Sequence, residues 1–243
     1  MANKFIQKLQ GFAKLTDKAV LALEAATSRP VDFEPRQDLI REGDRPGPVL
    51  VVLEGWAFRY KALPNGSRQI MAFLMPGDAC DLNIGMLDEM DHSIQTVTPA
   101  KVVKIAGETM AELMDTHRSI AKAMYVAQLV DEGTLRAWIV SLGRRSSAER
   151  AAHLLLELYV RGVHTGMSRD DEVELPLSQV VLADALGMTP VHINRVLQDL
   201  RQSGAIELQR KLLRIRDPAA LTRISGFDDN YLHRKLRKPA SKH

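Results

Sequence analysis

The segment from Gln179 to Gln198, QVVLADALGMTPVHINRVLQ, constrains the fold more than any other part of the chain. It consists of two short amphipathic pieces that meet at Gly187, where glycine ends a helix in the left-handed conformation without the strain that other residues incur. Thr189 is a good cap for the second piece, and Pro190 fits its first turn, where no backbone N–H is required. Small Ala183 lets two helices cross closely, and the inward apolar positions are Leu182, Leu186, Ile193, Val196 and Leu197. The segment therefore predicts a helix-turn-helix.

The outward face of the second predicted helix carries side chains that are suited to reading DNA. Its amide, imidazole and guanidinium groups can donate to base edges and phosphates in a major groove, and Arg195 is the best candidate for a base contact. From this motif we expect DNA contacts by Ser178, Gln179, Thr189, Pro190, Val191, His192, Asn194, Arg195 and Gln198. The alternative is a solvated charged surface around a small α/β core, because the motif also occurs in proteins that do not bind DNA.

Two apolar runs downstream of the motif predict a β-hairpin beside it. Residues 204–208 and 212–215 read as short strands about a basic tip at Gln209, Arg210 and Lys211, an arrangement that predicts a wing next to the DNA backbone. Arg201, Arg210 and Lys211 are expected near phosphates, where they and Arg214 would make the affinity depend on salt. Residues 234–243 form a basic tail, either a solvated end or a phosphate-binding arm.

The N-terminal half of the chain reads as a closed β unit preceded by a short helix. Thr16 is a plausible cap for a helix over Asp17 to Ser28. From Val31 to about Ile105, short apolar runs are separated by turn signals, among them Asn65-Gly66, which is typical of a tight hairpin. The run from 48 to 53 is apolar without alternation, as expected of a strand enclosed in a roll or barrel.

A long helix is predicted between the two parts. From Glu108 to Leu142 there is neither proline nor a turn cluster, and a stripe recurs every three or four residues: Ile120, Met124, Ala127, Val130, Thr134, Trp138 and Leu142. The stripe can pack on the chain's own β unit or against the same helix of a second chain, and its length favours a dimer seam. Gly143 then breaks the pattern, and Ser146 and Glu149 form a capping box that opens the next helix.

The composition limits the remaining classes of protein. With 243 residues, a net charge of +3 and a single cysteine, Cys80, the chain can have neither an internal disulfide nor an iron–sulfur cluster ligated by its own cysteines. The N-terminus lacks an apolar signal core, and no stretch approaches the roughly 20 apolar residues that span a bilayer. We therefore expect a cytoplasmic protein without a membrane partner.

The order of these parts resembles the Crp/Fnr family of bacterial transcription regulators over nearly the whole chain. The residues that carry the resemblance are 41–44 (REGD), 53–55 (LEG), 65–66 (NG), 76–78 (PGD), 148–152 (AERAA) and 175–178 (LPLS), which run into 182–184 (LAD). The resemblance implies an α+β fold with an N-terminal cyclic-nucleotide-binding-like β-roll (jelly roll), a long dimerisation helix and a C-terminal winged helix-turn-helix. We place the sensor domain at 1–117, the dimerisation helix and hinge at 118–145, and the DNA-binding domain with its tail at 146–243.

This family resemblance also implies the partners and the activity. A homodimer would bind double-stranded DNA at a near-palindromic operator and activate or repress transcription, with RNA polymerase as a further partner. In the best-known members the recognition helix places a glutamate in its first turn, whereas this chain has Val191, which offers only apolar contact, as to a thymine methyl. The operator should therefore differ from the usual family site at that step, while Arg195 should still prefer a guanine.

The effector implied by the resemblance is where the chain departs from the family. Cyclic-AMP receptors bind the ribose with a glutamate and the cyclic phosphate with an Arg-Ser pair, and the matching positions here are Leu82, His92 and Ser93. Leucine cannot accept a hydroxyl hydrogen bond, and histidine is a poorer anion clamp than arginine, so the sequence argues against cyclic AMP. The candidate effector pocket is Cys80, Asp81, Leu82, Asn83, His92 and Ser93. We predict no resident cofactor and leave haem or another small-molecule effector open.

Two other classes of function compete with this prediction. A cupin-like metal enzyme would need clustered ligands, but the sequence has no His-x-His pair and only His92 falls inside the predicted roll, so we expect neither catalysis nor a metal. A ligand-sensing β-roll protein that signals without binding DNA would need a complete phosphate clamp and a degraded helix-turn-helix. This sequence shows the reverse, which favours a regulator.

Overall fold

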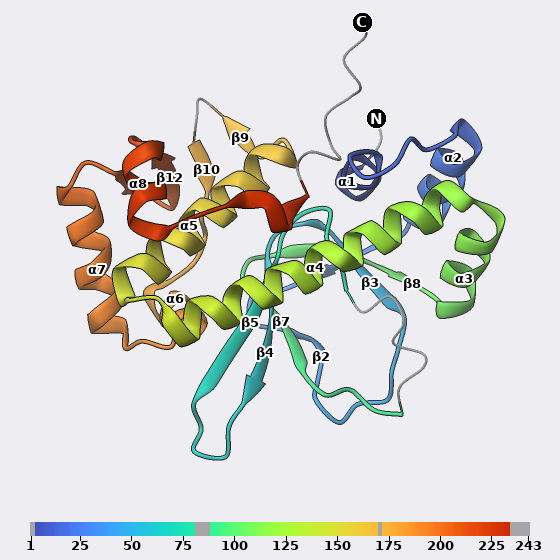
Figure 1. Ribbon diagram of the computed structural model, residues 1–243. Helices are drawn as coiled ribbons and strands as arrows, with labels where there is room; N and C mark the ends of the chain where they lie inside the picture. The colour runs from blue at the N-terminus through green and yellow to red at the C-terminus, as the bar shows by residue number, and fades with distance from the viewer. Residues whose placement is uncertain (1–2, 81–87, 170–171, 234–243) are drawn as a thin grey trace, which may run out of the picture. The chain divides into compact units, whose positions relative to one another are not determined.

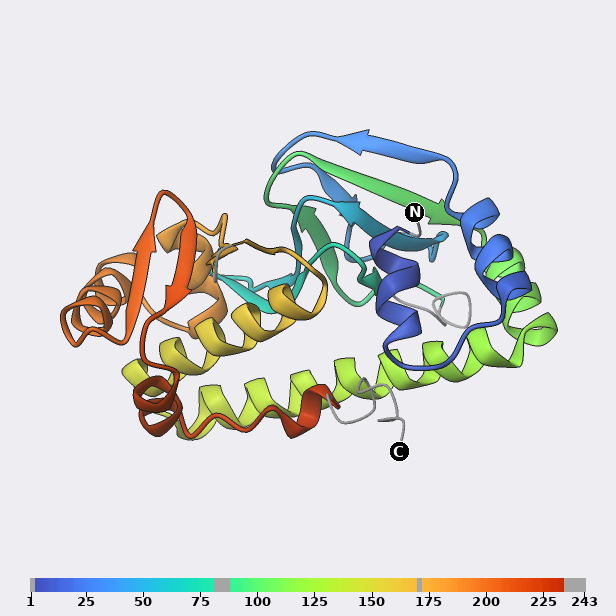
Figure 2. The same ribbon diagram turned by 90° about the horizontal axis from the view of Figure 1, so that it is seen from above.

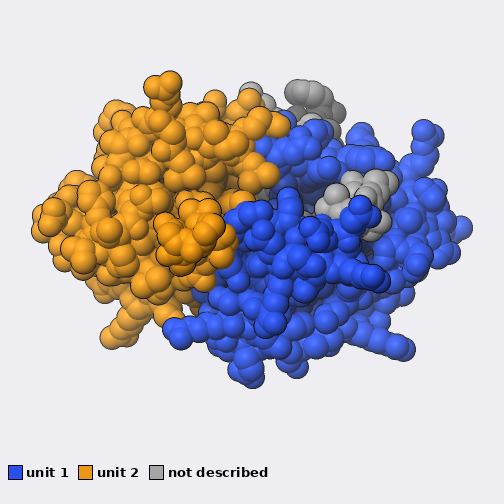
Figure 3. All heavy atoms as spheres, turned by 90° about the horizontal axis from the view of Figure 1, so that it is seen from below, with its two compact units in different colours: residues 1–61, 72–133, 232–243 blue, residues 62–71, 134–231 orange. Residues whose placement is uncertain are grey.

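The computed structural model describes residues 3–80, 88–169 and 172–233, which form two compact units (Figures 1 and 3). The first unit contains residues 1–61, 72–133 and 232–243, and the second contains residues 62–71 and 134–231. The boundary between the units falls inside the long helix, whereas the sequence led us to expect a boundary after it. The expected Asp81, Leu82 and Asn83 and the basic tail 234–243 lie outside the described residues.

The strands of the N-terminal part form a β-roll of two antiparallel sheets. One sheet has the order β1-β8-β3-β6 and the other β2-β7-β4-β5. The strands are β1 Pro30–Phe33, β2 Asp38–Ile40, β3 Val49–Glu54, β4 Ala57–Ala62, β5 Arg68–Leu74, β6 Ala79–Cys80, β7 Ser93–Thr96 and β8 Ala100–Ile105. Residues Val49 to Val52 of β3 are buried on both faces, which confirms that this apolar run is enclosed. The core around it contains Leu50, Val52, Leu74, Ile94 and Val102.

Two helices precede the roll, although the sequence indicated only the second. Helix α2 spans Asp17–Ala26 with the Thr16 hydroxyl as its cap, whereas α1, Lys4–Gln10, was not foreseen. Helix α1 buries Phe5, Ile6 and Leu9, and its Lys8 pairs with Asp78 at 2.5 Å beside the Pro76–Asp78 turn. The sequence did not reveal this helix, because a segment of seven residues is too short to show a clear helical period.

The single helix expected between residues 108 and 142 is in fact two. Helix α3 spans Gly107–Thr116, His117 is extended with φ −121°, and α4 then runs from Arg118 to Arg144. Gly143 does not end α4. A single glycine near the end of a long helix lowers its stability only modestly and does not have to end it. The junction to the next helix is therefore formed by Arg145 and Ser146.

The stripe assigned to the dimer seam faces the chain's own interior, which corrects that assignment. Ile120, Met124, Val130, Thr134 and Trp138 are buried within the single chain, and Ala127 and Leu142 are half-buried. The opposite face of α4 exposes large apolar side chains instead: Tyr125, Leu129, Leu135, Ile139 and Val140. Helical periodicity found a genuine apolar stripe but could not tell whether it meets the same chain or a partner.

The second unit is a winged helix with additional elements at both ends. It contains α5 Ser147–His164, β9 Ser168–Arg169, β10 Glu172–Glu174, α6 Gln179–Leu186, α7 Pro190–Gln202, β11 Ile206–Gln209, β12 Leu212–Ile215 and α8 Pro218–Ser225; a 3-10 turn, η2, spans Asp229–Leu232. Its sheet has the order β11-β12-β10-β9. The predicted capping box is present at the start of α5, where Ser146 and Glu149 bond each other's backbone N–H. Figure 2 shows α8 beside α5, with the β11–β12 hairpin near α7.

Among the described residues, no helix is both long enough and apolar enough to cross a bilayer.

Candidate DNA interface

Side-chain caps and one glycine shape the turn between α6 and α7. The Ser178 hydroxyl accepts from the Val181 N–H at 3.2 Å to open α6, and Gly187 closes it in the left-handed conformation at φ 63°, ψ 45°. The Thr189 hydroxyl accepts from the His192 N–H at 3.2 Å, and Pro190 occupies the first turn of α7. These local features, all visible in the sequence, fix the direction in which α7 leaves the turn.

The apolar side of the motif is buried as the sequence predicted. In α6 the buried residues include Leu182, Ala183 and Leu186, and in α7 they are Ile193, Val196, Leu197 and Leu200. The other side of α7 faces outward: Val191, His192, Arg195 and Gln198 are exposed and Asn194 is half-buried. Ser178, Gln179, Thr189 and Pro190 are exposed too. The predicted reading residues of α7 therefore lie on its exposed side, and those at the start of α6 and in the turn are exposed as well.

Val191 is the most exposed large apolar side chain of this face. Its exposed fraction is 73 %, although it lies in the first turn of a helix whose other apolar residues are buried. An exposed valine adds nothing to the core of its own chain. It is free to make an apolar contact with a ligand, and a thymine methyl is such a ligand.

The wing is a tight hairpin whose tip consists of two basic residues. Gln209 of β11 pairs with Leu212 of β12, so Arg210 and Lys211 form a two-residue loop. Their φ angles are 49° and 67°, as required of both central residues in the hairpin turn that matches strand twist. Asparagine and glycine usually occupy such positions because other side chains crowd the backbone there. The wing therefore carries strain at the two cations that we expect near phosphates.

Two other cations of this region hold partners in the chain. Arg214 pairs with Glu172 at 2.9 Å, and Arg216 pairs with Glu207. Arg201 is exposed, but its Nε–H donates to the Leu197 carbonyl of its own helix at 3.0 Å. Because Arg214 is paired with Glu172, we expect it to contribute less to phosphate binding than the sequence suggested. Arg195, Arg210 and Lys211 are exposed.

Two contacts that support the motif were not foreseen from the sequence. Arg150 of α5 donates to the Leu186 carbonyl at 2.9 Å and so caps the C-terminal end of α6. Arg68, in the hairpin segment 62–71 that belongs to the second unit, donates from Nε and Nη2 to the Asp184 carboxylate at 2.9 and 2.6 Å. Neither contact could be predicted from the sequence, because the partners are far apart along the chain.

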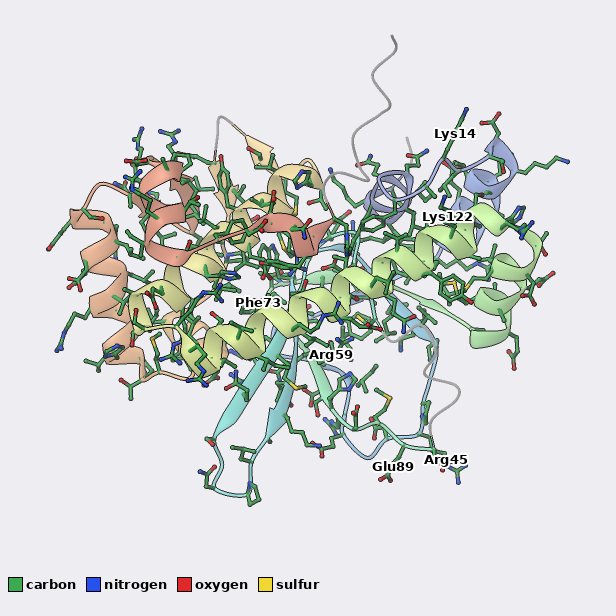
Figure 4. The ribbon with its side chains drawn as sticks, in the orientation of Figure 1. Lys14, Arg45, Arg59, Phe73, Glu89 and Lys122 are labelled. Carbon is green, nitrogen blue, oxygen red and sulfur yellow. The ribbon has the colours of Figure 1, made fainter. Side chains whose placement is uncertain are left out.

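In the β-roll, the residues that match the phosphate clamp are engaged with their own chain. Arg59, on β4 (Figure 4), donates to His92 Nε2 at 3.1 Å, which leaves the Nδ1–H to donate to Asp91 at 2.6 Å. That hydrogen bond from His92 holds the pKa of the Asp91 carboxyl below its usual value. The Ser93 hydroxyl accepts from the Glu42 N–H at 2.9 Å. Cys80 is fully buried on β6, opposite Leu50.

Comparison with known proteins agrees with both parts of this architecture. Residues 30–117 match the model of a cyclic nucleotide-binding domain, and residues 149–224 match that of a Crp-like helix-turn-helix domain. The nitrogen fixation regulation protein FixK of Azorhizobium caulinodans is 27% identical over 227 residues, which is 93% of this chain and 90% of that protein. FixK of Bradyrhizobium diazoefficiens is 28% identical over 198 residues, 82% of both chains. The structure of FixK2 from Bradyrhizobium japonicum, 21% identical, superposes with a TM-score of 0.72 over 82% of this chain and 98% of that one.

Fold and interface together define a DNA-binding transcription regulator with a cyclic-nucleotide-binding-like β-roll and a winged helix-turn-helix. The chain belongs to the Crp/Fnr family of transcription regulators, as its motifs indicated.

Proposed function

We propose that this regulator binds a near-palindromic operator as a homodimer and reads each half-site with the exposed face of α7. The observation that carries the proposal is this face itself, where Val191, His192, Arg195 and Gln198 are exposed. Thr189 caps the helix that carries them, and Arg150 caps the end of the preceding α6. Arg195 reads a guanine, Val191 contacts a thymine methyl, and the wing tip lies along the phosphates. We propose RNA polymerase as a further partner, because relatives of this chain are named transcriptional activators.

The seam of the proposed homodimer is the exposed apolar face of α4. Its members lie on one side of the helix and are exposed by 59% at Tyr125, 50% at Leu129, 36% at Leu135, 70% at Ile139 and 53% at Val140. In a single chain these apolar side chains stay exposed to water. Two copies of α4 related by a two-fold axis would bury them against each other. Pairing there would present two reading helices to successive major grooves.

We propose that operator binding does not require cyclic AMP. His92 already accepts from Arg59 and donates to Asp91, and Ser93 holds the Glu42 backbone, so an incoming cyclic phosphate would have to displace these bonds. Histidine also lacks the planar fork with which arginine binds a phosphate.

Selection of DNA from a random pool, with the purified protein in the presence and absence of cyclic AMP, tests these proposals. We expect the same palindrome in both conditions. Arg195→Ala should blur one position in each half-site and weaken binding by roughly 1–3 kcal/mol. Arg223→Ala, which removes an exposed arginine on α8, is the matched control. An equal loss on all sequences would make Arg195 a phosphate contact, and selection only with cyclic AMP would overturn the effector proposal.

A further inference from the structure

A buried carboxylate lies where three segments of the second unit meet. The Glu157 side chain, in the middle of α5, is 0% exposed. Burial raises the pKa of its carboxyl group, while the Arg161 cation acts in the opposite direction. A charge in such a place costs stability unless every lone pair is used, and an apolar residue of similar volume is often tolerated better. Core packing alone therefore does not explain a glutamate at this position.

The donors to Glu157 come from both sides of α5. The indole N–H of Trp138, near the end of α4, approaches both carboxylate oxygens at 3.2 and 3.0 Å. The hydroxyl of Tyr231, in the turn η2, donates to Oε2 at 2.8 Å. Arg161, one turn further along α5, completes the set at 3.4 Å from Oε1. One carboxylate thus joins the end of α4, the middle of α5 and the C-terminal segment.

Aromatic packing and a second arginine hold the C-terminal segment in place. The Tyr231 ring stacks on His153 of α5 at 6.0 Å between centroids, and Phe227 packs edge-on against the same imidazole at 5.1 Å. Arg145, in the junction between α4 and α5, donates to the Ser225 carbonyl at 3.1 Å and so caps the end of α8. The segment 225–231 therefore contacts both the junction and the helix that follows it.

From this arrangement we infer that Glu157 and Tyr231 are positioning residues that fix the angle between α4 and α5, and with it the separation of half-sites that the dimer accepts. The inference rests on the proposed function, because α4 carries the proposed seam and α5 supports α6 through Arg150. A change of angle at the junction of residues 145–146 would move the reading helix relative to the two-fold axis. We call the segment 225–231 the strap, because it contacts both the junction and α5 and so restrains the angle between the two helices.

Operators with altered half-site spacing test the inference. Half-sites identified by selection are placed at the preferred spacing, and one base pair closer or further apart, and the affinity of Tyr231→Phe is measured for each. The ring and its stacking remain, but one hydrogen bond to a buried carboxylate is lost. We expect an approximately tenfold loss of affinity at the preferred spacing and a smaller loss at the others, so that spacing selectivity falls. Glu157→Gln should change selectivity in the same direction, whereas Asn230→Ala, exposed in the same turn, should match the unmodified protein.

Hydrogen exchange on the free protein provides a readout that does not depend on DNA. Faster exchange of the amides of residues 141–150 in Tyr231→Phe than in Asn230→Ala, at a temperature where both are folded, supports the strap. An equal loss of affinity at every spacing, or unchanged exchange at the junction, would overturn it. If the unmodified protein itself prefers no spacing, the proposed homodimeric operator fails, and hydrogen exchange alone then decides whether the strap holds the junction.

Discussion

At the scale of single residues, the second unit keeps two ionisable groups in its interior, and each depends on a different neighbour. Glu157 relies on donors, as described above, whereas His153 is surrounded by rings and is only 2% exposed. Burial, together with a smaller effect of the nearby Arg145 cation, lowers the pKa of His153 to about 4. The imidazole is therefore neutral in the folded protein near neutral pH, which makes the stability of this unit sensitive to acid.

The sign of this pH dependence follows from proton binding. Between its unfolded value of 6.5 and its folded value of about 4, His153 binds a proton in the unfolded chain but not in the folded one. The stabilisation is therefore complete above pH 6.5 and is lost as the pH falls toward 4. We expect His153 to contribute roughly 2–3 kcal/mol to this loss. His153→Phe should make the denaturant midpoint depend less on pH between 7 and about 4.5, whereas His192→Asn, at an exposed position, should not. An unchanged slope in His153→Phe would exclude the imidazole as the cause.

At the scale of single elements, the wing combines strain with positive charge. Arg210 and Lys211 both adopt positive φ at a tip where glycine or asparagine would fit without strain. Residues in such conformations cost of order 1–3 kcal/mol each and are found where the surrounding structure or a function retains them. Here the retained property is positive charge at the exposed tip of the hairpin.

Substitutions at Lys211 separate strain from charge. Lys211→Gly should raise the free energy of unfolding by about 1 kcal/mol because the backbone strain is relieved. It should also weaken DNA binding uniformly over sequences and reduce the slope of log affinity against log salt by about one. Lys211→Gln, the matched control, should reduce the salt slope equally without a gain in stability. Thermal unfolding and salt titrations check both, and an unchanged salt slope would mean that the wing tip does not contact a phosphate.

At the scale of the whole molecule, the sequence predicted whatever depends on local chemistry. The helix-turn-helix was predictable because Gly187 marks the end of one helix, and Thr189 and Pro190 mark the start of the next. The capping box at Ser146 likewise marks the start of α5. The β-roll was predictable from its turns and from an apolar run on β3. What the sequence could not predict were contacts between distant residues, such as those of Glu157 with Trp138 and Tyr231, because a glutamate is expected at the surface unless its donors are known.

The orientation of α4 is the clearest case of such a contact. The helix has two apolar sides, and its period cannot tell which side meets a partner, because either side would show the same spacing. Burial resolves this: Met124 is 1% exposed and Trp138 6%, whereas Ile139, next to Trp138 in the sequence, is 70% exposed. The side that remains for a second chain is the one that the sequence did not single out.

The two sides of α4 therefore respond differently to substitution. Ile139→Glu places a charge at the most exposed residue of the proposed seam, where burial without a partner is costly, so we expect monomers at concentrations where the unmodified protein is dimeric. Affinity for the full palindrome should fall more than affinity for a single half-site, because only the dimer binds both half-sites at once.

Met124→Ala should instead cost about 2–5 kcal/mol of stability through a cavity in the chain's own core. Sedimentation equilibrium distinguishes the two, with Leu21→Glu, an apolar residue 64% exposed on α2, as the control for surface charge. Persistence of the dimer in Ile139→Glu would place the seam elsewhere than on this face of α4.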